Sequence, residues 1–98
     1  MILDKKLIQI PGTTLDFYTY EKDGLKYYEF DATECEPPEP MMNTLRGLAV
    51  LKSPNERLVG RYIHEPFPLY ERIPLSFEYK PTELPNGDFE VVFKRVKQ

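Results

Sequence analysis

A proline-rich segment at residues 36–40 constrains the fold of this chain more than any other feature. It reads Glu-Pro-Pro-Glu-Pro and holds three of the chain's ten prolines. Proline has no backbone N–H to give to a sheet, but it is tolerated in the first turn of a helix, where that N–H would lack a partner anyway. The carboxylates of Glu36 and Glu39 suit the positive end of a helix dipole. The segment therefore predicts that strands end before it and that a helix begins within it.

Two segments upstream of the prolines have the pattern of strands. Residues 15–20 alternate in period two and are rich in aromatic and β-branched side chains, and a second strand is predicted over residues 25–31. Between them, Lys22, Asp23 and Gly24 supply a turn, because Gly24 accepts a positive φ without a Cβ clash. The two segments are predicted to form a hairpin.

Downstream of the prolines, apolar residues recur at helical spacing as far as about Lys52. This stripe consists of Met41, Met42, Leu45, Leu48, Ala49 and Leu51. Gly47 lies inside it and costs roughly 1 kcal/mol relative to alanine. We therefore expect the helix to pack closely on the sheet at Gly47.

The rest of the chain predicts three more strands and one short helix or structured turn. Residues 57–63 are apolar on both faces, which favours a central strand. Residues 67–73, between several prolines, form the short helix or turn. A strand beginning at Leu75 and a last strand at residues 89–93 flank an Asn86-Gly87 turn.

This order predicts a two-layer α/β (α+β) sandwich. The core is a mixed four-stranded sheet in β-α-β-(α)-β-β order, and the N-terminal hairpin adds one strand. A strand, a helix and a strand in one sheet imply a right-handed parallel crossover, and the last two strands are antiparallel. We expect one domain over residues 1–98, with residues 1–26 as an N-terminal extension and residues 27–96 as the core.

Charge and cysteine content exclude several classes of function. The chain has 13 Lys and Arg against 16 Asp and Glu, a net charge of −3, whereas nucleic-acid and anionic-membrane binders need a basic excess. No apolar run approaches the roughly 18 residues of a membrane span or forms a leader. A single cysteine cannot form an internal disulfide, and this favours a location in the reducing cytoplasm.

The predicted β-α-β unit fixes where a site should lie. Ligands of such units bind beyond the carboxyl ends of the parallel strands, so the only thiol and the only imidazole of the chain are expected at one rim. We predict a rim for a ligand or partner made of Asp31, Glu36, Pro37, Glu39, His64 and Glu65.

Cys35 is the candidate for catalysis, and its surroundings in the sequence allow two interpretations. A helix dipole and an imidazolium would stabilise a reactive thiolate. Glu34, Glu36 and Glu39 oppose that ionisation, and a lone cysteine mostly behaves as a small hydrophobe.

The role of His64 also allows two interpretations. It could bind a divalent metal with Glu65, Asp31 and Glu34, or it could only hydrogen-bond a loop carbonyl, which we favour. No cofactor motif occurs. Tyr18, Tyr20, Tyr27 and Tyr28 are expected in the core and in cross-strand pairs rather than on a base-stacking platform.

Two segments of the chain resemble a known family. Residues 28–32 (Tyr-Glu-Phe-Asp-Ala) followed by residues 36–41 (Glu-Pro-Pro-Glu-Pro-Met) are similar to the opening of the TusA/SirA-like fold, and closest to the prokaryotic domain-of-unknown-function family 2249. Residues 64–66 (His-Glu-Pro), followed by Leu69 and Tyr70, resemble that family's second conserved loop. The resemblance covers about residues 27–96.

The resemblance also bears on activity. TusA-like sulfur carriers hold a persulfide on the cysteine of a Cys-Pro-x-Pro motif at the helix start. Pro38, Glu39 and Pro40 match the last three positions, so that cysteine's place falls on Pro37, and Cys35 lies two residues upstream. The resemblance thus implies the fold of a sulfur carrier without its motif cysteine.

These observations lead to one expected function and two alternatives. We expect a small cytoplasmic binding or accessory module without catalysis of its own and without a cofactor. Its protein partner is not identified by the sequence, and a free sheet edge favours a homodimer. The alternatives are a sulfur-relay or thiol redox protein acting through Cys35, and a metal-binding module using His64.

Overall fold

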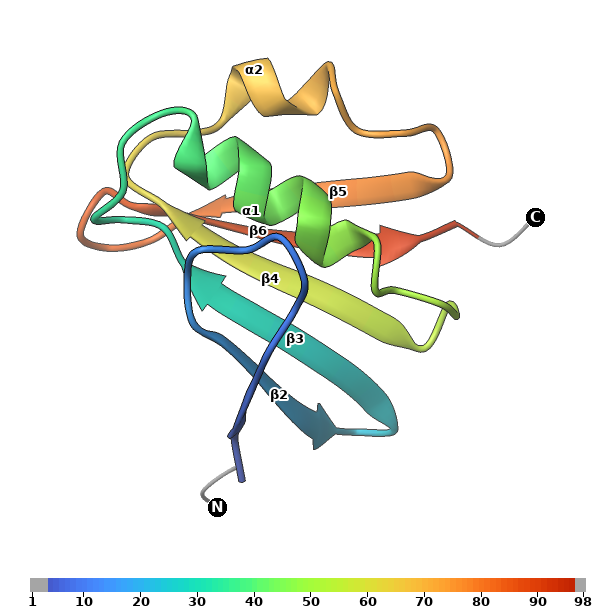
Figure 1. The fold of residues 1–98 in the computed structure, drawn as a ribbon. Coiled ribbons are helices and arrows are strands. Elements are labelled where there is room, and N and C mark those ends of the chain that lie inside the picture. Colours follow the sequence, from blue (N-terminus) through green and yellow to red (C-terminus); the bar gives the residue numbers. More distant parts are fainter. Residues whose placement is uncertain (1–3, 97–98) are drawn as a thin grey trace.

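The computed structural model describes residues 4–96, which form one six-stranded sheet and two helices (Figure 1). The strands are β1 (Lys6–Ile8), β2 (Phe17–Lys22), β3 (Leu25–Asp31), β4 (Glu56–Tyr62), β5 (Phe77–Glu83) and β6 (Phe89–Arg95). The helices are α1 (Glu39–Leu48) and α2 (Phe67–Tyr70). The strand order in the sheet is β1-β2-β3-β4-β6-β5.

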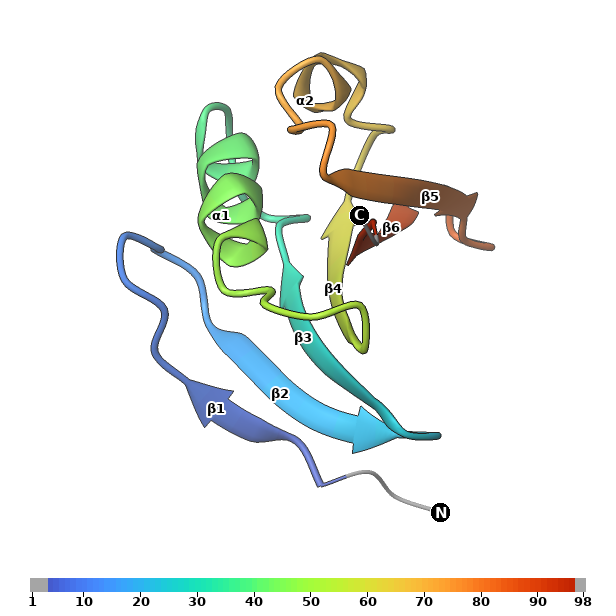
Figure 2. The same cartoon turned by 90° about the vertical axis from the view of Figure 1, so that its right-hand side faces the viewer.

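Both helices cover the same face of a strongly twisted sheet, so the predicted two-layer α+β architecture is confirmed (Figure 2). β3 and β4 pair in parallel through the α1 crossover, as expected, and every other neighbouring pair is antiparallel. β4 lies between β3 and β6, which confirms the prediction of a central strand.

Apart from shifts of one or two residues at strand ends, the sequence-based prediction differs from the structure in three details. Four core strands and one added hairpin strand were predicted, but the sheet has a sixth strand, β1. The prediction missed β1 because it spans only three residues and shows no alternation of apolar and polar side chains. The helix α1 ends at Leu48 rather than near Lys52, since the N–H groups of Val50 and Leu51 bond three residues back and tighten the chain into a turn. Leu75 precedes β5 and is 99% exposed.

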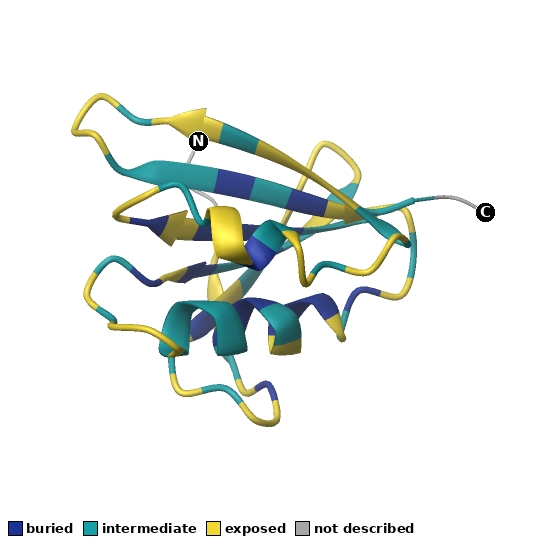
Figure 3. Ribbon diagram, turned by 90° about the horizontal axis from the view of Figure 1, so that it is seen from above, coloured by how far each residue is buried: buried dark blue, intermediate teal, exposed yellow. Residues whose placement is uncertain are grey.

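Gly47 of α1 lies directly against the sheet, as its position in the apolar stripe predicts. A Cβ at this position would come within 3.0 Å of Leu58 on β4 and 3.0 Å of Phe17 on β2. Phe17, Leu58 and Phe93 are fully buried beneath the helix, and the buried residues gather on the inner strands and on the sheet-facing side of α1 (Figure 3). The missing side chain thus allows helix and core to meet closely.

Asn43 ties the segment between β1 and β2 to α1. This side chain is completely buried, and its Oδ1 accepts hydrogen bonds from the N–H groups of Thr14 (2.9 Å) and Leu15 (3.2 Å). Its Nδ2 donates to Thr14 Oγ1 and to the Glu39 carbonyl. The N-terminal strands are therefore anchored to the helix as well as paired in the common sheet.

The tyrosines of β2 and β3 divide between the two faces of the sheet, and three of the four follow the expectation, whereas Tyr18 is 36% exposed and lies opposite Glu29. Tyr28 is buried in the core, whereas Tyr20 and Tyr27 stack across the strands with ring centroids 5.1 Å apart. Neither helix between residues 4 and 96 is long and apolar enough to cross a membrane.

Candidate functional site

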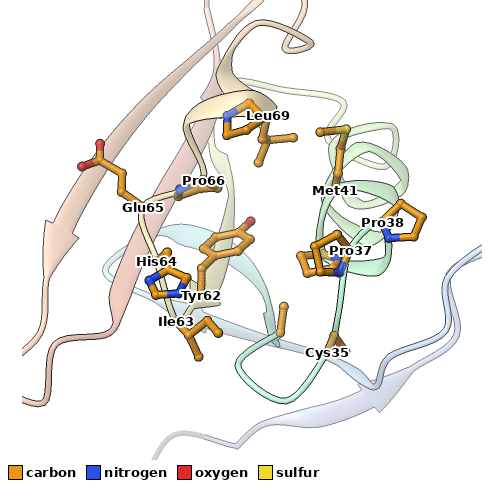
Figure 4. A pocket seen from close by; sticks show the side chains of 13 residues that line it. Cys35, Pro37, Pro38, Met41, Tyr62, Ile63, His64, Glu65, Pro66 and Leu69 are labelled. Carbon is orange, nitrogen blue, oxygen red and sulfur yellow. The ribbon is translucent and has the colours of Figure 1, made fainter.

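A cavity of about 340 Å³ opens beyond the carboxyl ends of β3 and β4, between the start of α1 and the helix α2 (Figure 4). This is the place that the β-α-β connection predicts for a ligand. The segment after β3 forms one wall and the segment after β4 forms the other, because the two strands run in parallel and end at the same edge of the sheet.

The cavity is lined almost entirely by apolar side chains. Five of the lining residues are prolines: Pro37, Pro38, Pro40, Pro66 and Pro68. Four more are aliphatic or thioether side chains: Ala32, Met41, Ile63 and Leu69. The remaining four bring polar or titratable groups: Cys35, Tyr62, His64 and Glu65. None of these described lining residues is a lysine or an arginine.

Tyr62 forms the buried floor between the two walls. Its side chain, only 3% exposed, folds back along β4 over Gly60, where a Cβ would come within 2.8 Å of the ring atom Cζ. The hydroxyl lies 2.6 Å from Thr44 Oγ1 on α1. Burial is the main cause that raises the pKa of Tyr62 above its ordinary value, so the hydroxyl stays neutral at physiological pH.

Cys35 contributes its side chain to the wall below Pro37 (Figure 4). The pKa of its thiol is raised, first by loss of solvent and then by the negative charges of Glu39, Asp31 and Glu34. A thiol in these surroundings is protonated at neutral pH and is a poor nucleophile.

The structure brings together four of the seven predicted site residues. Cys35, Pro37, His64 and Glu65 all line the cavity, so the thiol and the imidazole do share one rim although 29 positions separate them. The Glu65 carboxylate turns away from the space between the walls and accepts a hydrogen bond from Tyr70 at 3.2 Å.

The other three predicted residues, Asp31, Glu36 and Glu39, lie outside the cavity lining. Asp31 accepts two hydrogen bonds from Thr33, which holds the turn after β3. Glu39 accepts one from Thr14 Oγ1 at 2.6 Å, so it serves the anchor of the N-terminal segment. Glu36 is exposed and offers its carbonyl to the Glu39 N–H. Asp31 and Glu39 act on the Cys35 thiol through their charge rather than by contact, whereas the expected effect of Glu36 on this thiol is not found.

A metal site through His64 finds no support in the arrangement of side chains. Between residues 4 and 96, no three or more His, Cys, Asp or Glu side chains are grouped closely enough to hold a metal ion. His64, Glu65, Asp31 and Glu34 are scattered in the sequence, and the fold does not bring them together as a metal-binding group.

Tyr62 and Leu69 are lining residues that the sequence did not single out as part of a site. One signal was available for Tyr62, because an isolated glycine inside a strand marks close approach of another group. Gly60 is such a glycine, and the group that approaches it is the ring of Tyr62, two residues further on. No comparable signal exists for Leu69, whose role depends on how α2 packs.

Comparisons with protein-family models, with curated proteins and with solved structures found no significant match to this chain. The likeness to TusA/SirA-like proteins therefore stays a prediction.

Proposed function

We propose that this chain is a small binding module without catalysis of its own, and that the cavity between α1 and α2 is its ligand site. The observation that carries the proposal is the cavity itself. Its volume of about 340 Å³ falls in the range of small-molecule sites, and its apolar walls surround a small number of polar groups, which is the usual composition of such sites.

The surroundings of Cys35 support binding over chemistry. A sulfur carrier or thiol redox protein needs a thiolate, and both burial and three nearby carboxylates raise the pKa of this thiol. The resemblance to sulfur carriers points the same way, because the position of the carrier cysteine is occupied by Pro37. In this proposal, the chain keeps a fold similar to that of a sulfur carrier but uses it to bind a ligand rather than to carry sulfur.

The proposal is tested with a neutral aromatic probe, 2-naphthol, by isothermal titration calorimetry on the wild-type chain. We expect saturable binding of one probe per chain. The variant Ile63→Trp adds bulk at a lining side chain that is 47% exposed, and it should weaken binding at least tenfold. Leu75→Trp adds similar bulk at a site that is 99% exposed and outside the lining, and it should leave binding unchanged.

Two results would contradict the proposal. The first is no saturable binding of the probe to the wild-type chain. The second is equal loss in both tryptophan variants, because that would place the bound probe elsewhere or reflect a general loss of structure.

A further inference from the structure

An open groove runs along the outer face of α1. It has a volume of about 350 Å³ and is lined by Pro38, Met41, Met42, Leu45, Arg46 and Ala49, all of them on α1 or at its two ends. Pro38 and Met41 also line the cavity, so the two hollows meet at the start of the helix. Between residues 4 and 96, no other helix or strand lies over this face of α1 (Figure 1).

The groove is apolar because α1 carries apolar side chains on its outer side as well as toward the sheet. Met42, Leu45 and Ala49 follow one another at spacings of three and four residues, which places them along one side of a helix. The outer side of a helix that covers a sheet is ordinarily polar. A contiguous apolar strip there indicates that another apolar body binds to it, and methionine side chains adapt readily to the shape of such a body.

Arg46 is the one charged residue among the described residues that line the groove. Its side chain lies across Gly12, where a Cβ would come within 2.8 Å of Arg46 Nε. No carboxylate between residues 4 and 96 pairs with it, since the ion pairs found there join Lys5 to Glu29 and Arg61 to Glu90. A guanidinium presents a fork of N–H donors that matches a carboxylate. The groove therefore offers one cation, toward the end of α1, that has no anionic partner.

The length of the path suits an extended chain rather than a single ring system. Along a helix that rises ~1.5 Å per residue, residues 38–49 extend for about 16 Å. The cavity continues this path beyond Pro38 and adds about 340 Å³ of mainly apolar space. A ligand that fills both hollows is therefore long, narrow and apolar over most of its length.

The charges around the two hollows favour one direction for a chain with an anionic end. Burial, and then three nearby carboxylates, raise the pKa of the Cys35 thiol in the cavity wall. The field of these carboxylates opposes an anion in the cavity, although the His64 imidazole and the Met41 N–H lie at the same lining. Arg46 attracts an anion at the other end of the path.

From these observations, and resting on the proposed function, we propose that the cavity and the groove together bind an amphiphile with one extended apolar chain and one terminal carboxylate, of the fatty-acid type. The end of the chain enters the cavity. The rest of the chain lies along Met42 and Leu45, and the carboxylate pairs with Arg46.

Methionine methyl NMR on the wild-type chain tests the path of the ligand. Dodecanoate is titrated below its micelle concentration at pH 7.5, and the methyl signals of Met41 and Met42 should both shift with one midpoint at one ligand per chain. 2-Naphthol, which fills the cavity alone, should shift Met41 only, because Met42 lines the groove and not the cavity.

Calorimetry with two further probes tests the chain and the head group. Hexanoate should bind at least tenfold more weakly than dodecanoate, because it buries fewer methylene groups. Dodecyltrimethylammonium has the same chain length and a positive head, and it should bind at least fivefold more weakly. The net charge of −3 would favour the cation if binding were non-specific, so a preference for dodecanoate reports the site itself.

Arg46→Gln isolates the head-group contact. It should lower the affinity for dodecanoate at least fivefold and leave the binding of 2-naphthol unchanged, which also shows that the variant is folded. Arg72→Gln is the matched control, since Arg72 is exposed and lines neither hollow, and it should leave both affinities unchanged.

The outcomes separate this inference from the proposed function. Binding of 2-naphthol without binding of dodecanoate, or a dodecanoate complex that shifts Met41 alone, overturns the inference and leaves the cavity as a site for smaller molecules. Equal loss in the two arginine variants, or a larger loss in His64→Gln than in Arg46→Gln, overturns the placement of the carboxylate. A concentration-dependent dimer in sedimentation that shifts Met42 without any ligand assigns the groove to a second copy and overturns the inference too. Binding of neither probe overturns the proposed function as well.

Discussion

The hydroxyl oxygen of Tyr62 on β4 lies 2.6 Å from Thr44 Oγ1 on α1, and both side chains are buried. This contact joins the central strand to the crossover helix directly beneath the cavity. It therefore stabilises the packing of the helix on the strand.

Thr44→Val should destabilise the fold more than Tyr62→Phe. Loss of the Tyr62 hydroxyl leaves Thr44 bonded to Pro40 and should cost about 1 kcal/mol, whereas valine leaves a buried donor unpaired and should cost about 1–3 kcal/mol. The double variant should lose less than the sum of the two, by about 1 kcal/mol. Urea unfolding of all four chains measures these differences, and strict additivity would show that the two hydroxyls do not interact.

Asn43→Ala should lower the free energy of unfolding by about 2–3 kcal/mol, because it leaves the N–H groups of Thr14 and Leu15 without their acceptor. Asn55→Ala changes an exposed asparagine and should shift stability by less than about 0.5 kcal/mol. Thermal unfolding of both variants measures the effect. Similar melting temperatures for the two would argue against the anchoring role of Asn43.

Gly60→Ala should displace the ring of Tyr62 and destabilise the chain by about 1–3 kcal/mol. A Cβ there would come within 2.8 Å of Tyr62 Cζ and 2.9 Å of Phe30 Cζ, and neither ring is at the end of a flexible chain. Alanine at Gly24, where a Cβ has open space, separates packing from backbone strain, since φ is positive at Gly24 but not at Gly60. Calorimetric unfolding gives both values, and an unchanged Gly60→Ala chain would refute the close approach.

Cys35 should react slowly with iodoacetamide at neutral pH. Burial and the charges of Glu39, Asp31 and Glu34 raise the pKa of the thiol, so the rate should reach half its maximum at a higher pH than for a free thiol, whose pKa is about 8.5. The rate is followed by mass spectrometry as a function of pH. A midpoint below that of free cysteine, or a stable persulfide after incubation with a cysteine desulfurase, would favour the sulfur-relay alternative.

Stability should fall in alkali, in part because of Tyr62. Burial raises its pKa in the folded chain above the ordinary value of about 10, so above that pH the unfolded state loses a proton that the folded state keeps. Its contribution is complete below pH 10 and is lost as the pH rises further. Urea unfolding between pH 9 and 11 should show a weaker decline for Tyr62→Phe, and parallel curves would contradict the assignment.

The layers of the fold could be predicted because its signals are local. The alternation at residues 15–20, the prolines before α1 and the Asn86-Gly87 turn each act through neighbouring residues. β1 was missed because its pairing depends on β2 and on the anchor at Asn43, not on its own three residues.

The site was predictable only as far as topology determines it. Cys35 and His64 lie at one rim because β3 and β4 are parallel and end at the same edge of the sheet, so this placement does not depend on side-chain contacts. The directions of Glu39 and Asp31 depend on single partners, Thr14 and Thr33, and no sequence pattern reports such contacts. The position of the Tyr62 hydroxyl depends on its contact with Thr44, which lies 18 positions away in the sequence and belongs to the helix layer.

Methionine methyl NMR tests the central claim, that the cavity between α1 and α2 is the ligand site, most directly. Met41 lines the cavity and its neighbour Met42 does not, so the two ¹³C-methyl signals report on the cavity wall and on an adjacent control position. On titration with 2-naphthol, we predict a saturable shift of the Met41 methyl and contacts between it and the probe's ring protons, with the Met42 signal unmoved. A Met41 signal that does not move, or equal shifts at both methyls, would contradict the account.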